Sequence, residues 1–263
     1  MRVARRLLAA VVSGATLAGA CLAPAAHAAP RVTLNAALTP ERLGHGTTIG
    51  FGFQITAPAG EVPLPVTEID LRYPSGLGIA VSGLGLATCR VERLQAAGPR
   101  RCPANSIMGY GTVLAEIPLG PEIVQEATRV TIVRGPTQDG HIALLFNADG
   151  GDPISAQIVL PGLLLPTPPP YGGRINLDVP LVPSLPAGPD VSVVEMHATL
   201  GPEHVTYYER LRGRTVAYRP RGVLLPNSCP RGGFPFAAAF TFLDGAQTNA
   251  VTTVPCPRRR SSR

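Results

Sequence analysis

The sequence places three charged side chains at every second position of one short segment. Glu68, Asp70 and Arg72 are separated by apolar residues, so in a strand the three charged groups point to the same face. The Cα atoms of the two acids then lie about 6.5 to 7 Å apart, near the spacing of a glycosidase carboxylate pair. We expect a salt-bridged surface instead, because Arg72 follows on that face and the chain has no tryptophan for sugar stacking.

Four histidines beyond the N-terminal segment are candidates for a Ser-His-Asp triad, which occurs on unrelated folds in any chain order. They are His45, His141, His197 and His204. His141 follows Asp139-Gly140, which is typical of a hairpin tip. His197 lies on the polar face of its segment, opposite Met196 and Ala198. We therefore expect structural or solvent roles for both.

Two frequent enzyme motifs are missing. The chain contains no GxSxG sequence, and it has no lysine with which to end a phosphate-binding loop. Residues 149–152 (DGGD) offer oxygen ligands for Ca²⁺ but lack the spaced acids of an EF-hand, so a turn is the simpler interpretation. We predict no catalytic residue, no cofactor site and no metal site, and hence no enzyme.

The cysteines favour a structural role. Cys89, Cys102, Cys229 and Cys256 remain once Cys21 of the N-terminal segment is set aside, and an even number is typical of an oxidising compartment. Of the three possible pairings, we favour the two local ones, 89 with 102 and 229 with 256. Each would stabilise the fold by roughly 3 kcal/mol in the chain-entropy model. Zinc is disfavoured because no pair has CxxC spacing and no histidine lies at ligand spacing.

Two apolar segments follow neither the residue period of a helix nor that of a strand. Residues 76–80 and 83–87 repeat a GLGxA unit, which is either a buried connection under a small helix or an outward surface for lipid or a hydrophobic partner. Residues 163–165 are three leucines between prolines, and they either line a groove or fill the interior. The candidates for an apolar contact are Leu77, Ile79, Leu84, Leu86, Leu163, Leu164 and Leu165.

The elements that must position these groups are strands. The chain has 29 glycines and 29 prolines in 263 residues, which excludes helical bundles. About a dozen short alternating segments separated by turn residues predict an all-β fold, an antiparallel β-sandwich of Ig-like or jelly-roll-like type, as one large or two small sandwiches. These segments are 49–55, 69–73, 113–117, 130–133, 142–146, 154–160, 175–179, 191–200, 205–208, 215–218 and 236–242.

Helix is scarce, with one or two short stretches expected. The best candidate is 90–97, which Gly98-Pro99 ends and which lies between Cys89 and Cys102. A second short turn is expected over 121–127. The first disulfide should therefore pin a small helical insert to the sheet.

Five segments organise the chain. A signal peptide is expected because three arginines precede an apolar run that ends in small residues, which indicates export to the extracellular space or the cell envelope and no membrane span in the mature chain. A proline-rich crossover is expected to be extended, outside any strand ladder. The segments are 1–28 (signal peptide), 29–160 and 171–257 (the two sandwich parts), 161–170 (crossover) and 258–263 (basic tail).

Charge is concentrated at the two ends. Three of the 23 arginines lie in residues 1–28 and four in 258–263, so the remainder has 16 basic and 17 acidic residues. A nearly neutral body does not predict a nucleic-acid partner, which requires a basic stripe on the folded domain. The tail itself is expected to be a solvated end.

Several segments together resemble a known group. Residues 83–89 (GLGLATC), 102–106 (CPANS), 109–111 (GYG) and 225–230 (LPNSCP) before 236–244 look like an uncharacterised group of secreted, β-rich actinobacterial proteins with paired cysteines. The resemblance covers nearly the whole mature chain. It implies export, the cysteine pairs and an all-β fold, and it carries over no activity or ligand.

The function expected from these observations is non-catalytic. We expect a secreted or envelope-associated β-sandwich that binds a partner or has a structural role. The sequence does not identify the partner, and a cell-envelope component and an apolar ligand are the two alternatives. The alternative is an extracytoplasmic carrier of an apolar or lipid ligand, and the third possibility is an exported hydrolase.

Overall fold

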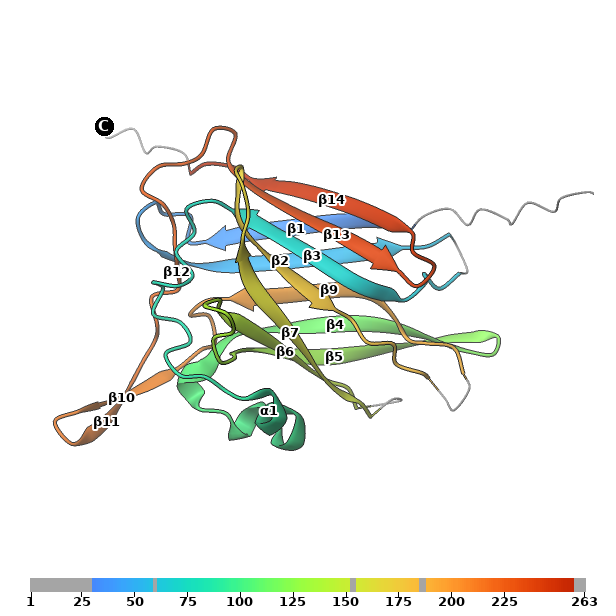
Figure 1. Cartoon of the computed structure of the whole chain (residues 1–263), viewed down its shortest axis with the longest axis horizontal. Coiled ribbons are helices and arrows are strands. Elements are labelled where there is room, and N and C mark those ends of the chain that lie inside the picture. The colour runs from blue at the N-terminus through green and yellow to red at the C-terminus, as the bar shows by residue number, and fades with distance from the viewer. Residues whose placement is uncertain (1–29, 59–60, 152–154, 185–187, 258–263) are drawn as a thin grey trace, which may run out of the picture.

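The computed structural model describes residues 30–58, 61–151, 155–184 and 188–257 (Figure 1). The expected signal peptide and basic tail lie outside these ranges. The fold is all-β, as the sequence predicts, and most of its strands form one sheet. None of the helices in the described ranges has both the length and the hydrophobicity that crossing a membrane requires.

The chain alternates strands with short connections, and a single helical insert, α1 (Val91–Ala97), interrupts them. The strands are β1 (Arg31–Thr39), β2 (Gly46–Thr56), β3 (Val66–Pro74), β4 (Ile107–Leu119), β5 (Glu122–Arg134), β6 (Ala143–Asp149), β7 (Gln157–Pro166), β8 (Tyr171–Asp178), β9 (Ser192–Leu200), β10 (Tyr207–Leu211), β11 (Arg214–Tyr218), β12 (Val223–Leu224), β13 (Phe234–Phe242) and β14 (Gln247–Val254). Two 3₁₀ turns, Pro99–Arg101 and Ala104–Ser106, follow the helix.

One antiparallel sheet contains twelve of these strands. Its order is β1-β2-β9-β4-β5-β6-β7-β8-β3-β13-β14, and β12 pairs with β2. The sheet curls on itself, so that β14 lies beside β1 and the Thr248 hydroxyl donates to the Pro30 carbonyl at 3.2 Å (Figure 1). The result is a sandwich-like arrangement in which the two end strands of a long sheet are neighbours.

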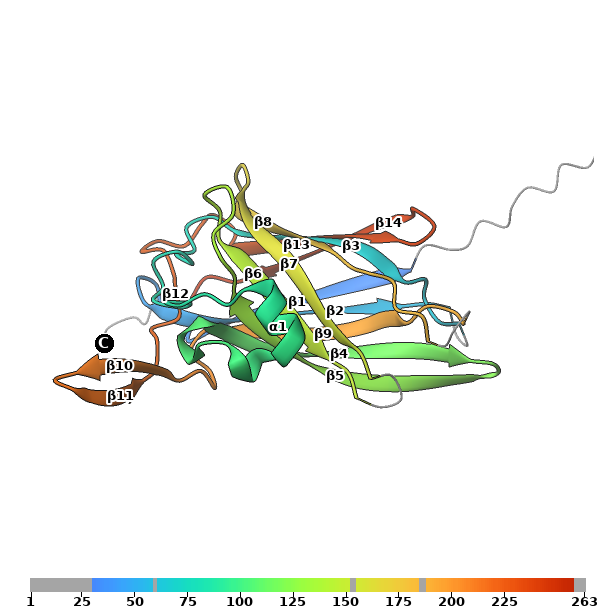
Figure 2. The ribbon, with the colours of Figure 1, turned by 60° about the horizontal axis from the view of Figure 1, so that its bottom comes forward.

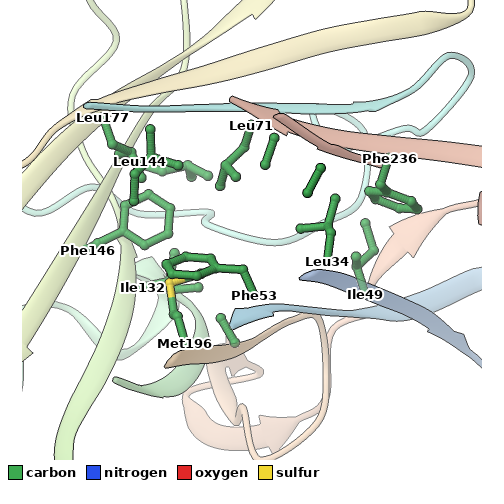
Figure 3. Packing of buried hydrophobic residues seen from close by; sticks show 14 of the residues in the cluster. Leu34, Ile49, Phe53, Leu71, Ile132, Leu144, Phe146, Leu177, Met196 and Phe236 are labelled. Carbon is green, nitrogen blue, oxygen red and sulfur yellow. The ribbon is translucent and has the colours of Figure 1, made fainter. Parts of the chain in front are cut away.

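The concave side of the curled sheet encloses the main core. Alternate residues of each strand point inward, and Figure 3 shows Leu34, Ile132 and Met196 converging from β1, β5 and β9. The rings of Phe53 and Phe240 meet edge to face with centroids 4.9 Å apart. Strands from both halves of the chain therefore share one core.

A second, smaller core lies on the outer side of the sheet. Helix α1 lies over the sheet beside β6 and β7 (Figure 2). Leu94 of α1 is fully buried, and it belongs with Val133, Leu145 and Val159 of β5, β6 and β7 to one cluster. The Cys89–Cys102 disulfide closes the insert beside this cluster. The helix ends at Gly98, whose N–H donates to the Leu94 carbonyl at 2.9 Å. The expected helical insert pinned by a disulfide is thus confirmed.

Two local expectations are wrong. Residues 121–127 are not helical but form the start of β5, because a two-residue Gly120-Pro121 turn with φ of 64° at the glycine pairs β5 with β4 along its whole length. Residues 161–166 are not a solvated crossover but the end of β7, which pairs with both β6 and β8. Strand pairing thus overrides the local preferences of proline and glutamate in residues 121–127 and of proline in residues 161–166.

Candidate functional site

The charged row on β3 is a salt-bridged surface. Asp70 accepts from Arg72 Nε at 2.9 Å and from Arg174 Nη1 of β8 at 3.2 Å. Asn176 Nδ2 donates to the Glu68 carboxylate at 2.8 Å. Both acids are therefore paired with neighbours on the same sheet, as expected for a salt-bridged surface.

The first two histidines have structural surroundings. His45 Nδ1 lies 2.9 Å from the Leu43 carbonyl in an exposed turn. His141 closes the β5–β6 hairpin by two backbone hydrogen bonds to Gln138, and Asp139 and Gly140 form its tip with φ of 50° and 79°. The hairpin tip expected at Asp139-Gly140 is confirmed.

The other two histidines line one groove. It lies on the outer face of β1, β2, β9 and β4, and its volume is about 520 Å³. The strand register places Asn35, Gly52, His197 and Thr112 in one row across these strands. A second row contains Ala37, Gly50, Thr199 and Tyr110. Glu203 and His204 border the groove from the β9–β10 connection.

Small residues make the floor of this groove. A Cβ atom at Gly52 would lie 2.6 Å from His197 Nδ1 and 2.7 Å from the Met196 carbonyl oxygen. A Cβ atom at Gly50 would meet the Cβ of Ala37 at 3.6 Å. The imidazole of His197 thus lies directly over β2, in space that only glycine leaves open.

Each groove histidine has a glutamate beside it. His197 Nε2 lies 2.7 Å from a carboxylate oxygen of Glu195, two residues earlier on the same face of β9. His204 Nε2 lies 3.6 Å from a carboxylate oxygen of Glu203. Both imidazoles are largely exposed. The groove therefore offers two imidazole–carboxylate pairs that a ligand can reach.

Neutral polar groups complete the lining. The Thr199 hydroxyl donates to the Tyr110 carbonyl at 3.2 Å, and Thr112 lies beside His197 in the first row. Burial raises the pKa of the Tyr110 phenol above its ordinary value of 10.0. A protonated phenol, hydroxyls and the Asn35 amide can each donate and accept hydrogen bonds.

The interior offers two smaller cavities. One, of about 120 Å³, lies at the end of the curled sheet and is lined mainly by valine, isoleucine and leucine side chains. Two polar residues, Glu126 and Thr128, also line it, and Glu126 is 6 % exposed and accepts from the Gly151 N–H at 2.9 Å. The other cavity, of about 80 Å³, lies among the core residues of Figure 3, between β2, β3, β6 and β9.

Three of the seven residues expected to make an apolar contact are buried. Ile79, Leu84 and Leu164 belong to the main core, where the 76–86 segment fills an end of the curled sheet, so they offer no surface. Three others, Leu77, Leu163 and Leu165, are half-buried. Leu86 is the outward-facing one, with 60 % of its surface exposed.

Both favoured cysteine pairs are present. Cys89–Cys102 has a Cα separation of 5.3 Å, and Cys229–Cys256 has one of 5.8 Å. Within the described ranges, no three histidine, cysteine, aspartate or glutamate side chains cluster as metal ligands. Asp152 of the DGGD loop lies outside the described residues.

Sequence reasoning did not find the groove. It placed His197 on a polar face, but Asn35 and Tyr110 lie far from it in the chain and meet it only through strand pairing. The Gly50 and Gly52 pair in an otherwise β-branched and aromatic strand was the available signal, since strand glycines often mark a close approach. No protein-family model, curated protein or solved structure matches the chain.

Proposed function

We propose that this protein is a secreted or cell-envelope-associated binding protein that acts without catalysis, and that the outer groove is its binding site. The observation that carries the proposal is the groove volume of about 520 Å³, within the range of roughly 300 to 1,000 Å³ typical of ligand sites. The interior cavities of about 120 and 80 Å³ fall below that range.

Export is part of the same proposal. Two disulfides support an oxidising compartment, because such bonds do not persist in a reducing cytosol. The N-terminal segment with its three arginines and apolar run supplies the signal, and the resemblance to secreted actinobacterial proteins agrees with it.

The lining favours a polar and extended ligand. Asn35, Tyr110, Thr112 and Thr199 present amide and hydroxyl groups along two rows, and the floor between them is shallow. Hydroxyl and amide groups of a cell-envelope polymer, such as peptidoglycan, are matching partners. An open groove also lets a polymer chain continue beyond both ends of the site.

The test fills the groove without disturbing the core. Ala37 is exposed beside Gly50, so Ala37→Phe places a ring over the floor. Thr33→Phe is the matched control, since Thr33 lies on the same face of β1 outside the groove. Calorimetric titration with soluble peptidoglycan fragments should show that the wild type and the control bind with similar affinity. The affinity of Ala37→Phe should be lower by a factor of about ten or more. Equal binding by all three proteins would place the site elsewhere.

A carrier of an apolar ligand is the second candidate, favoured by the lining of the end cavity. Val113, Ile158, Leu160 and Val193 face one another there around about 120 Å³. An acyl chain needs more room, so this function requires the cavity to enlarge on binding. Native mass spectrometry of the purified protein distinguishes the two, because a carrier retains a lipid adduct and a groove-binding protein does not.

An exported hydrolase is the third candidate, and the His197–Glu195 pair is the feature that favours it. A general base needs a nucleophile within hydrogen-bond reach. The hydroxyls of Ser82, Ser106 and Ser192 donate to backbone carbonyls. A screen of esters, amides and glycosides should show no turnover that His197→Ala abolishes. If the wild type turned over a substrate and His197→Ala did not, the protein would be an enzyme and the proposed non-catalytic function would be wrong.

A further inference from the structure

The β10–β11 hairpin stands apart from the main sheet. The two strands pair only with each other, and they project from the body of the molecule (Figure 1, Figure 2). Arg212 and Gly213 form the turn with φ of 49° and 80°, as a two-residue hairpin turn requires. Every residue from 208 to 217 is exposed. Such a ribbon buries too little surface to be stable by itself.

The base of the hairpin is fixed firmly to the body. The buried Tyr207 hydroxyl donates to the first carbonyl of β4 at 2.7 Å and lies 2.6 Å from the Gly85 amide, which donates to it. Asn105 exchanges two hydrogen bonds with the backbone of Tyr208, at 2.8 and 2.9 Å. The rings of Tyr207 and Tyr218 pack edge to face. These contacts hold the ribbon in one direction, with its tip away from the body.

Positive charge gathers on this ribbon and its return segment. Residues 207–221 hold five arginines and one acid, Glu209, although residues 29–257 as a whole are nearly neutral. None of these guanidinium groups forms an ion pair with another described residue. The arginines are Arg210, Arg212, Arg214, Arg219 and Arg221. The ribbon is therefore a local cationic surface, whose charge other described residues leave uncompensated.

Exposed apolar side chains accompany the charge. Tyr208, Leu211 and Val216 are 49 %, 50 % and 39 % exposed, three of the ten large apolar side chains that the described residues expose. The register places Leu211 and Val216 on the same face, with Leu211 opposite Arg214 next to the turn. Leu86, exposed as well, follows Gly85 at the base of the hairpin.

We propose that this hairpin docks the protein on a membrane surface that contains anionic lipid. Leu211 and Val216 enter the interface between headgroups and acyl chains, Tyr208 lies at headgroup level, and the arginines bind lipid phosphates. The inference goes beyond the groove and does not depend on it, since the two surfaces share no residue.

The combination of clustered arginines with an exposed leucine beside the turn favours lipid over a soluble polyanion. A polyanion such as heparin is held by arginine alone, and an exposed leucine beside the turn adds nothing to that binding. An anionic bilayer uses both groups, because it offers phosphates at its surface and an apolar region directly beneath. Because the hairpin projects from the body, its arginines and its exposed leucine reach a flat membrane before the rest of the protein does.

Cosedimentation with lipid vesicles tests the proposal. The protein used is the full chain, purified after any processing by the cell that expresses it. Vesicles of equal parts phosphatidylcholine and phosphatidylglycerol should bind the protein, and pure phosphatidylcholine vesicles should not. The triple variant R210Q/R212Q/R214Q should bind about 100-fold more weakly. The control R31Q/R42Q/R129Q removes the same charge from exposed positions scattered over the body, and it should bind nearly as the wild type does.

Leu211→Ser separates lipid from a soluble polyanion. It should weaken vesicle binding roughly tenfold, while any binding to heparin stays unchanged. Since residues 208–217 are exposed, all variants should keep the wild-type circular dichroism spectrum and melting temperature. The proposal is overturned if the wild type ignores the anionic vesicles, if both triple variants lose binding equally, or if Leu211→Ser binds them as the wild type does.

Discussion

At the scale of single residues, glycine and paired charges shape the surface. Asp70 is nearly buried beneath two guanidinium groups, from Arg72 and Arg174, and this arrangement turns a catalytic-looking row into a structural one. Gly52 does the opposite, because its missing side chain leaves room for the His197 ring and opens a groove. Both arrangements arise because side chains two positions apart on a strand lie on the same face of the sheet.

Gly52→Ala should disturb both the fold and the groove. Its Cβ would meet the Met196 carbonyl oxygen at 2.7 Å, and backbone cannot move aside as a flexible side chain can. We expect a loss of roughly 1 to 3 kcal/mol in the free energy of unfolding, measured by urea titration, with displaced His197 imidazole resonances in NMR spectra. Gly151→Ala is the control, since nothing lies within 4 Å of its added Cβ, and it should stay within about 1 kcal/mol of the wild type. Equal stability of the two variants would contradict this geometry.

At the scale of elements, the two disulfides differ in their surroundings. The Cys89–Cys102 bridge is buried beside α1, whereas the Cys229–Cys256 bridge joins the loop before β13 to the end of β14, with Cys256 exposed. The two bridges therefore differ in their access to a thiol in solution.

We expect the two disulfides to be reduced in sequence. Under native conditions a limiting amount of dithiothreitol should open Cys229–Cys256 first, because a thiolate must reach a sulfur atom to attack it. Alkylation followed by peptide mass mapping identifies which cysteines have become free. Labelling of Cys89 and Cys102 before the other pair would show that the helical insert opens more readily than its packing indicates.

At the scale of the whole molecule, the curl of the sheet decides what is inside and what is outside. It brings β14 beside β1 and encloses the aromatic core, while leaving the outer faces of β1, β2, β9 and β4 open. The hairpin projects from this body (Figure 2), and residues 207–221 carry five arginines and one acid although residues 29–257 as a whole are nearly neutral. The proposed binding groove and the proposed docking hairpin therefore lie on separate parts of one molecule.

The whole fold should become less stable in alkali. Burial raises the pKa of Tyr73, Tyr110 and Tyr207 above 10.0, although the Gly85 hydrogen bond lowers that of Tyr207. Below about pH 10 these phenols are protonated in both states and add no pH dependence. Above it the unfolded chain loses protons first, so the free energy of unfolding falls as the pH rises.

Urea titrations at a series of pH values measure this fall. Tyr207→Phe should reduce its slope, whereas Tyr208→Phe, at an exposed position, should leave the slope as in the wild type. A free energy of unfolding that stays constant well above pH 10 would contradict the raised pKa values.

Much of the fold could be predicted because its signals are local. Alternating apolar residues identified β2, β3, β9 and β13, and short cysteine spacings gave both disulfides. The edge strands β1 and β14 were overlooked although both alternate, since their outward positions are small or polar and their apolar runs are weak. The ends of β5 and β7 were misassigned because proline and glutamate have local preferences that ladder pairing outweighs.

By itself, the amino-acid sequence determined that this protein is built of strands, stapled by two local disulfides and interrupted by one helical insert. Each of those features depends on residues close together in the chain. Only the tertiary structure decided which polar residues share a surface. Asn35, Tyr110 and His197 meet through the strand order of a curled sheet, and Arg210, Arg212 and Arg214 lie close together because residues 208–217 leave the body as one ribbon. Strand order is set by packing between distant segments, and no single segment encodes it.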